Sequence, residues 1–219
     1  MFPHIISNPS IYSATMIDET TEEKRPSVSE AKKVPSKFQK ALDMLGFVSG
    51  IVILLGLIVL TYNGKLRLLS PRDPVHLATF SSKIEFTARY WILPLVWLYV
   101  SMHLVVLKRI SSKAQNPLSG NEALVASSVN IFTNSIEQFL MSLAAQLTLI
   151  TFIESEKIIR LIPLINIAYV VGRILFWIGY PKYRTLGMTV TMLPTSLAIY
   201  LSLYRFVFYW IDFHYLIDF

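Results

Sequence analysis

A group of polar side chains lies within an apolar run that is long enough to cross a membrane. Asn130, Asn134 and Glu137 are spaced at i, i+4 and i+7, so at 100° per residue they share one face of a helix. Gln138 lies beside that face. An ionised side chain at the centre of a membrane helix costs about 2.5–3.5 kcal/mol on insertion scales. We therefore expect these side chains to face other helices and to have polar partners there.

Arg173 is the candidate partner, because it is the one basic residue well inside an apolar run of the sequence. It shares a helical face with Asn166 and Tyr169. An ion pair between Glu137 and Arg173 would lower the cost of burying either charge, so we predict this contact. Two interpretations stay open. The polar residues either fasten helices together, as amides and hydroxyls do in membranes, or form a binding site, which is the usual role of intramembrane ions.

A second group lies in the basic turn that follows, at Tyr180, Lys182, Tyr183 and Arg184. These residues are expected at the mouth of the same helices, where they could bind an anion such as a ligand carboxylate or a lipid phosphate. For Lys182 we favour the simpler interpretation of a topology signal. Arg184 directly precedes the next apolar run, so it stays a candidate for anion binding.

The composition places the chain among membrane proteins. Of its 219 residues, 53% are hydrophobic and 16% are charged, and the mean hydropathy is +0.51, whereas about a quarter of the residues in soluble domains are charged. The lack of cysteine excludes disulfides, zinc–thiolate sites and a cysteine nucleophile. The histidines lack metal-ligand spacing, so we expect no bound metal. The net charge of +6 comes from residues that flank apolar runs, which indicates contact with a lipid bilayer rather than with nucleic acid.

The apolar runs predict an all-α integral membrane protein with five spans. The first, at 41–62, is an additional N-terminal helix, and residues 90–219 form a four-helix membrane domain. The tail 1–40 is polar and rich in proline, which predicts disorder, and residues 63–89 form a polar loop. The later spans are expected at 90–107, 122–153, 161–178 and 187–209.

The basic residues and the short connections give the expected topology. Apart from Arg173 and Arg205, which lie within spans, eleven Lys and Arg residues fall on the side of the N-terminus and seven on the other side. This bias predicts a cytosolic tail, a lumenal first loop and a lumenal C-terminus. Short connections make the last four spans antiparallel neighbours. Gly46-x-x-x-Gly50 predicts close packing of the first span.

Residues 90–209 resemble the MAPEG family, the membrane-associated proteins in eicosanoid and glutathione metabolism. The family motif Arg-x-x-x-Asn-x-x-Glu reads Asn130-x-x-x-Asn134-x-x-Glu137 here, and Arg173 precedes a Gly179-Tyr180 pair as in the family's third helix. Arg184, in Y-R-T-L-G-M, matches the arginine that opens the fourth helix. The resemblance implies a homo-oligomer, typically a trimer, that binds glutathione near the cytosolic face. The implied ligand-binding residues are Asn130, Asn134, Glu137, Gln138, Arg173, Tyr180 and Arg184.

Three departures from the family pattern determine the functional expectation. The aromatic residue after Arg173 is Phe176 instead of the family's frequent tyrosine, which removes one hydroxyl. Asn130 stands where the family has an arginine that helps to hold the charged groups of glutathione. The additional span at 41–62 matches the five-span mattrin branch of the family, and it could cover a subunit interface and leave a dimer. That resemblance implies a non-catalytic multi-pass protein of the endoplasmic reticulum, Golgi or lysosome. Its implied role is to regulate the trafficking or turnover of membrane proteins such as Frizzled-type Wnt receptors.

An enzyme is the alternative that the resemblance leaves open. A glutathione-dependent transferase or peroxidase acting on lipophilic substrates would use Arg184 as its catalytic residue, because the guanidinium would stabilise the glutathione thiolate. A transporter or channel ranks below both, since the sequence shows no inverted repeat.

Overall fold

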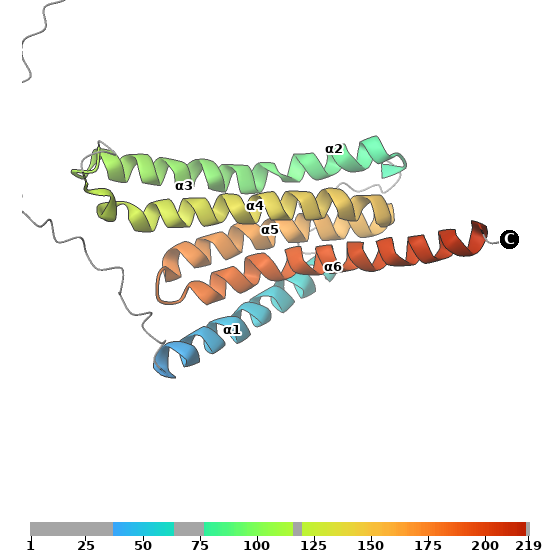
Figure 1. The fold of residues 1–219 in the computed structure, drawn as a ribbon, viewed down its shortest axis with the longest axis horizontal. Coiled ribbons are helices and arrows are strands. Elements are labelled where there is room, and N and C mark those ends of the chain that lie inside the picture. The colour runs from blue at the N-terminus through green and yellow to red at the C-terminus, as the bar shows by residue number, and fades with distance from the viewer. Residues whose placement is uncertain (1–36, 64–76, 116–119, 218–219) are drawn as a thin grey trace, which may run out of the picture. The chain divides into compact units, whose positions relative to one another are not determined.

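The computed structural model describes residues 37–63, 77–115 and 120–217, and within these ranges every regular element is helical (Figure 1). The helices include five segments that are long and apolar enough to cross a membrane, which confirms the prediction of an all-α protein with five spans. The expected tail at 1–40 lies outside the described residues up to position 36. The elements are α1 (Lys37–Tyr62), α2 (Phe80–Tyr90), α3 (Ile92–Ile110), the short 3₁₀ helix η4 (Glu122–Leu124), α4 (Ala126–Phe152), α5 (Ser155–Gly179) and α6 (Arg184–Ile217).

Helix α2 lies in a region that the sequence predicts as loop, at 63–89. It begins with a capping box: the Ser82 backbone N–H donates to Thr79 Oγ1 over 3.2 Å, and the Thr79 N–H donates to Ser82 Oγ over 3.2 Å. Phe86 and Tyr90 are buried, whereas the opposite face is polar. The loop prediction was wrong here because an amphipathic helix with a polar half lacks the apolar composition of a span. A turn at Trp91 connects α2 to α3, and together they form one candidate span.

The start of α4 and the α4–α5 connection also differ from the prediction. A single helix is expected over 122–153, but η4 precedes α4, which begins at Ala126. The Glu122 carboxylate does not cap the helix; it accepts two hydrogen bonds of 2.9 Å from the Arg109 guanidinium at the end of α3. The connection between the spans expected at 122–153 and 161–178 is much shorter than these bounds predict, because α5 already begins at Ser155.

Helices α3 to α6 pack together, and consecutive helices contact one another, as their short connections predict. The α5–α6 contact is the most extensive, and two glycines make it close. A Cβ added at Gly187 would collide with the backbone of Phe176, and one at Gly172 would collide with Thr191. Near the α4–α5 connection the interior is apolar and is built from Leu149, Ile150, Ile158 and Ile162, with Phe86 and Tyr90 from α2.

Helix α1 packs against α6 and α5. A Cβ added at Gly50 would lie 2.7 Å from Thr189 Cβ, and one at Gly46 would lie 3.0 Å from the backbone nitrogen of Leu186. These close approaches confirm the packing predicted from the Gly46-x-x-x-Gly50 spacing. A hydrogen bond also joins this end of α1 to α6, since Thr185 Oγ1 donates to Asp43 Oδ1 over 2.7 Å.

Candidate functional site

Arg173 is the centre of a buried polar contact that joins α4, α5 and α6. Its side chain is fully buried. Nη1 donates to Asn134 Oδ1 on α4 over 2.6 Å, and Nε donates to Thr191 Oγ1 on α6 over 3.1 Å. Nη2 has the Met188 sulfur at 3.9 Å. The guanidinium also lies 4.8 Å from the centre of the Phe176 ring. The contact therefore links three helices through one side chain.

The local sequence explains how the guanidinium is held. The glycines at 172 and 187 bring α5 and α6 close enough for Arg173 to reach Thr191. The Thr191 hydroxyl donates to the Gly187 carbonyl over 2.9 Å, which leaves its oxygen free to accept from Arg173. Hydrogen bonds to a charged group are worth about 1.5–3 kcal/mol each, and a desolvated cation over an aromatic face gains about 2 kcal/mol. Neutral partners thus offset much of the cost of burying this charge.

The predicted ion pair between Glu137 and Arg173 is wrong. The ion pairs of the described residues join Arg89 to Glu85, Arg109 to Glu122 and Lys157 to Glu154, and Glu137 is exposed on α4. Asn134 takes the position opposite Arg173. Glu137 is three residues further along the helix than Asn134. Its side chain is therefore rotated by about 60° around the helix axis and lies closer to the C-terminal end of α4, away from Arg173.

Asn130 and Tyr180 form a second polar link between α4 and the end of α5. Asn130 Nδ2 donates to the Tyr180 hydroxyl over 3.2 Å. Tyr180 is half-buried, and its ring lies 5.5 Å from that of Phe176, which stacks on Arg173. The asparagine at 130 is therefore accommodated by a neutral hydroxyl partner.

Gln138 and Arg184 do not join these contacts. Gln138 is half-buried, and Arg184 begins α6 with its side chain exposed. Among the described residues, neither has a hydrogen bond to Asn130, Asn134, Arg173 or Tyr180. The structure thus brings together two pairs of the predicted site residues, and it leaves Glu137, Gln138 and Arg184 apart from them.

A further polar network lies along α4 and α5 and was not predicted as a unit. Asn166 Nδ2 donates to Gln146 Oε1 over 2.8 Å, and Gln146 Nε2 donates to Ser142 Oγ over 3.0 Å. All three side chains are buried. Nearby, the Tyr169 hydroxyl donates to the Ser135 carbonyl over 2.6 Å. The sequence feature that could have predicted this network is Gln146, because a glutamine inside an apolar run needs a hydrogen-bond partner on a neighbouring helix.

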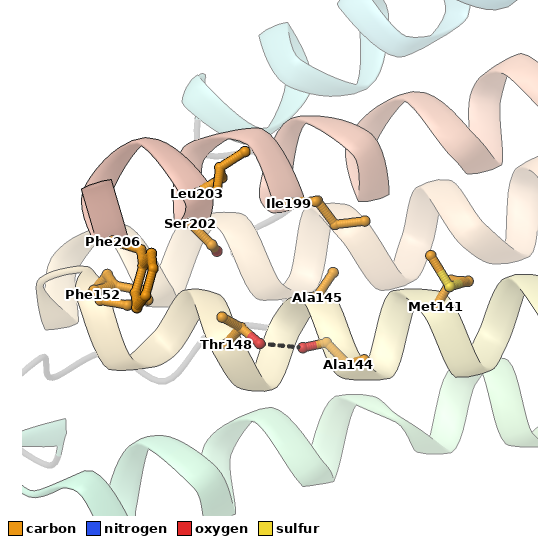
Figure 2. Close-up of a pocket in the computed structure, with 9 residues that line it drawn as sticks. All are labelled: Met141, Ala144, Ala145, Thr148, Phe152, Ile199, Ser202, Leu203 and Phe206. Atoms are coloured by element: carbon orange, nitrogen blue, oxygen red, sulfur yellow. Dashed lines mark hydrogen bonds between the residues drawn. The ribbon is translucent and has the colours of Figure 1, made fainter. Parts of the chain in front are cut away.

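An open apolar groove of ≈ 340 Å³ lies between α4 and α6 (Figure 2). Met141, Ile199 and Leu203 are among its lining residues. Two hydroxyls also line it, but Thr148 donates to the Ala144 carbonyl and Ser202 to the Ala198 carbonyl. The groove therefore presents an apolar surface, and its lining includes none of the predicted site residues.

The apolar spans and the buried interhelical polar contacts define an α-helical multi-pass membrane protein. Comparison with known proteins does not assign the chain to a family, because no family model, no curated protein and no solved structure matches it.

Proposed function

We propose that this chain is a non-catalytic membrane protein with a MAPEG-like four-helix domain, of the mattrin type, that regulates the trafficking or turnover of other membrane proteins. The resemblance of its motifs suggests the secretory pathway as its location and Frizzled-type Wnt receptors as its clients. The observation that carries the non-catalytic part is the bonding of Arg173. Each of its nitrogens already has a partner in the same chain, namely Thr191, Asn134 and Met188, whereas an arginine that binds a carboxylate or phosphate often presents two parallel N–H donors to it.

The separation of the remaining polar residues supports the same proposal. A cofactor site needs a few polar groups that converge on one cavity. Glu137 and Arg184 are both exposed, they lie on different helices, and Asn130 is bonded to Tyr180. The polar residues of α4 and α5 then act chiefly as fastenings between helices.

The exposed face of α4 supports a role in binding other membrane proteins. Glu137 lies eleven residues after the start of α4, or roughly 16 Å along the helix at 1.5 Å per residue, which is near the middle of a hydrocarbon core of about 30 Å. Asn130 and Thr133 are exposed on the same side. A carboxylate facing lipid at this depth is costly, so we infer that a second copy of the chain or another membrane protein covers it.

A glutathione assay separates this proposal from the enzymatic alternative. We expect purified protein in detergent to show no heat of glutathione binding at millimolar ligand, and no conjugation or peroxidase turnover above background with lipophilic substrates. The Arg184→Ala variant should behave in the same way. Turnover well above background that is lost in Arg184→Ala would instead establish a glutathione transferase or peroxidase with Arg184 as its catalytic residue.

A cellular experiment tests the regulatory part. Depletion of the protein should change the surface abundance of Frizzled-type receptors, measured by surface biotinylation, and expression of the intact chain should restore it. The Glu137→Leu variant should fail to restore it, because it alters the exposed face of α4, whereas Gln138→Ala should succeed. Unchanged receptor levels after complete depletion would refute the proposed clients. Imaging of the tagged chain against organelle markers tests the endomembrane location.

A further inference from the structure

We propose that the first turn of α1 and the α5–α6 turn together form a binding site for a phosphate-bearing lipid headgroup. The site contains Lys37 and Lys40 of α1 with Lys182 and Arg184 of the turn, and we call it the basic headgroup site. It does not depend on the polar contacts of α4 or on the function proposed above. Its basis is that folding gathers four cations from two distant parts of the sequence at one end of the helices.

Specific contacts bring the two elements together. Gln39 Nε2 donates to the Lys182 carbonyl over 3.3 Å, across 143 residues of sequence. One turn further along α1, Asp43 accepts the hydrogen bond from Thr185. The close packing of Gly46 and Gly50 on α6 fixes the angle and depth of α1. Lys40, which follows Gln39 directly in the first turn of α1, therefore lies at the same end of the helices as Lys182.

The cations of the site are available to a ligand. All four side chains are exposed, and none takes part in the ion pairs found among the described residues. The Asp43 carboxylate, which lies one turn further along α1, accepts hydrogen bonds from Thr185 and Gln39. A topology signal needs only the number of basic residues in each loop. The convergence of α1 with the turn is a further feature that topology does not require.

The surroundings favour a lipid headgroup over a soluble anion. Lys37 begins the first candidate span and Arg184 begins the last, so the site lies at the level where a span leaves the hydrocarbon. Phe38 and Tyr183 lie next to the lysines with 71% and 53% of their surfaces exposed. Tyrosine is enriched at this level of a membrane, where its ring lies among the lipid headgroups. A lysine near an anionic membrane surface gains about 1 kcal/mol, or about fivefold in affinity.

Native mass spectrometry of the full chain in detergent, titrated with individual lipids, tests the proposal. We expect the protein to retain phosphatidylinositol 4-phosphate in preference to phosphatidylcholine. The Lys40→Gln/Lys182→Gln variant should bind the phosphoinositide about 25-fold more weakly, following the gain of about fivefold per cation. The control, Lys108→Gln/Lys113→Gln, removes the same charge from the last turn of α3 and the connection that follows it. It should stay within about twofold of the unmodified chain because those cations lie outside the site. Circular dichroism and gel filtration verify that both variants fold.

Three results would overturn the proposal. The first is equal retention of phosphatidylcholine and phosphoinositide by the unmodified chain. The second is an equal loss in the test and control variants, which would indicate general charge attraction without a site. The third is binding of soluble inositol phosphate as tight as that of the intact lipid, which would assign the cations to a soluble anion instead of the membrane.

Discussion

At the scale of single residues, Arg173 shows how a membrane helix can bury a cation without a carboxylate. Its partners are an amide, a hydroxyl, a thioether and an aromatic face. Removing one partner of a buried charge leaves a donor without an acceptor, and in an apolar interior no water is at hand to replace it. Asn134 is therefore a residue on which the stability of the helix packing depends.

The Asn134→Leu variant tests that dependence. It leaves Nη1 of Arg173 unpaired in the interior, so we expect a loss of about 2–3 kcal/mol in the free energy of unfolding. The measurement is reversible denaturation in mixed micelles, followed by circular dichroism. Gln138→Ala is the matched control from the same helix, and we expect a change within about 0.5 kcal/mol because that side chain has no interhelical bond to the site. Equal losses in both variants would contradict the assigned role of Asn134.

The double variant Asn134→Leu/Arg173→Met provides a separate prediction. Replacing both partners with apolar side chains removes the unpaired charge, so most of the stability lost in Asn134→Leu should return. A double-mutant cycle on the same denaturation measurements gives the interaction energy of the pair. Additive losses would show that Asn134 and Arg173 act independently, against the contact seen between them.

The sequence could predict which residues meet in this region only in part. Helical spacing indicates which face of a helix a side chain occupies, and it correctly placed Asn134 and Arg173 on facing sides. Spacing does not give the vertical offset between two helices, and that offset decides whether Arg173 meets Asn134 or Glu137. Here other contacts between α4 and α5 accompany that offset, such as the hydrogen bonds from Tyr169 to the Ser135 carbonyl and from Asn166 to Gln146. Thr191 carries no signal of its own, because a threonine in a span usually bonds to its own helix.

At the scale of elements, composition predicted the spans more reliably than their ends. The five spans follow from long apolar runs, which depend on summed hydropathy and not on single residues. The ends depend on competition between local partners. Glu122, the first residue of the span expected at 122–153, pairs with Arg109, and α4 begins later. The Thr79–Ser82 capping box starts α2 inside the predicted loop. Such choices depend on which partner is close in space, which a single sequence does not reveal.

The packing of α1 on α6 leads to a prediction with an internal control. Gly50→Val should push α1 away from α6, because even a Cβ at this position would lie 2.7 Å from Thr189 Cβ. Gly56→Val makes the same chemical change in the same helix, where no atom lies within 4 Å of the added Cβ. The chain has no cysteine, so Asp43→Cys/Thr185→Cys can report α1 docking as disulfide formation. We expect the disulfide to form with Gly56→Val and to be strongly reduced with Gly50→Val.

At the scale of the whole molecule, the distribution of Lys and Arg predicts the orientation in the membrane. The α3–η4 and α5–α6 connections carry basic residues and lie on the side where α1 begins, so we expect this side to face the cytosol. An N-glycosylation acceptor inserted after Asn63 should be glycosylated in microsomes, since it would face the lumen. The same acceptor inserted after Gln115 should remain unmodified. The reverse pattern would overturn the proposed topology and with it the cytosolic position of the basic headgroup site.

The exposed polar face of α4 leads to a prediction about assembly. If a second copy of the chain covers Glu137, side chains on this face approach their own copies across the interface. Thr133→Cys places a single thiol on that face, and Val100→Cys places one on the exposed surface of α3. Both positions lie roughly 10–15 Å along their helices from the ends that the α3–η4 connection joins, at 1.5 Å per residue.

Mild oxidation in membranes should give a cross-linked dimer with Thr133→Cys and little with Val100→Cys. Equal cross-linking at the two positions would indicate random collision in the bilayer. No cross-linking at Thr133→Cys would exclude a two-fold dimer through this face, so that a different contact would have to cover Glu137, because leaving the carboxylate exposed to lipid at mid-span is costly.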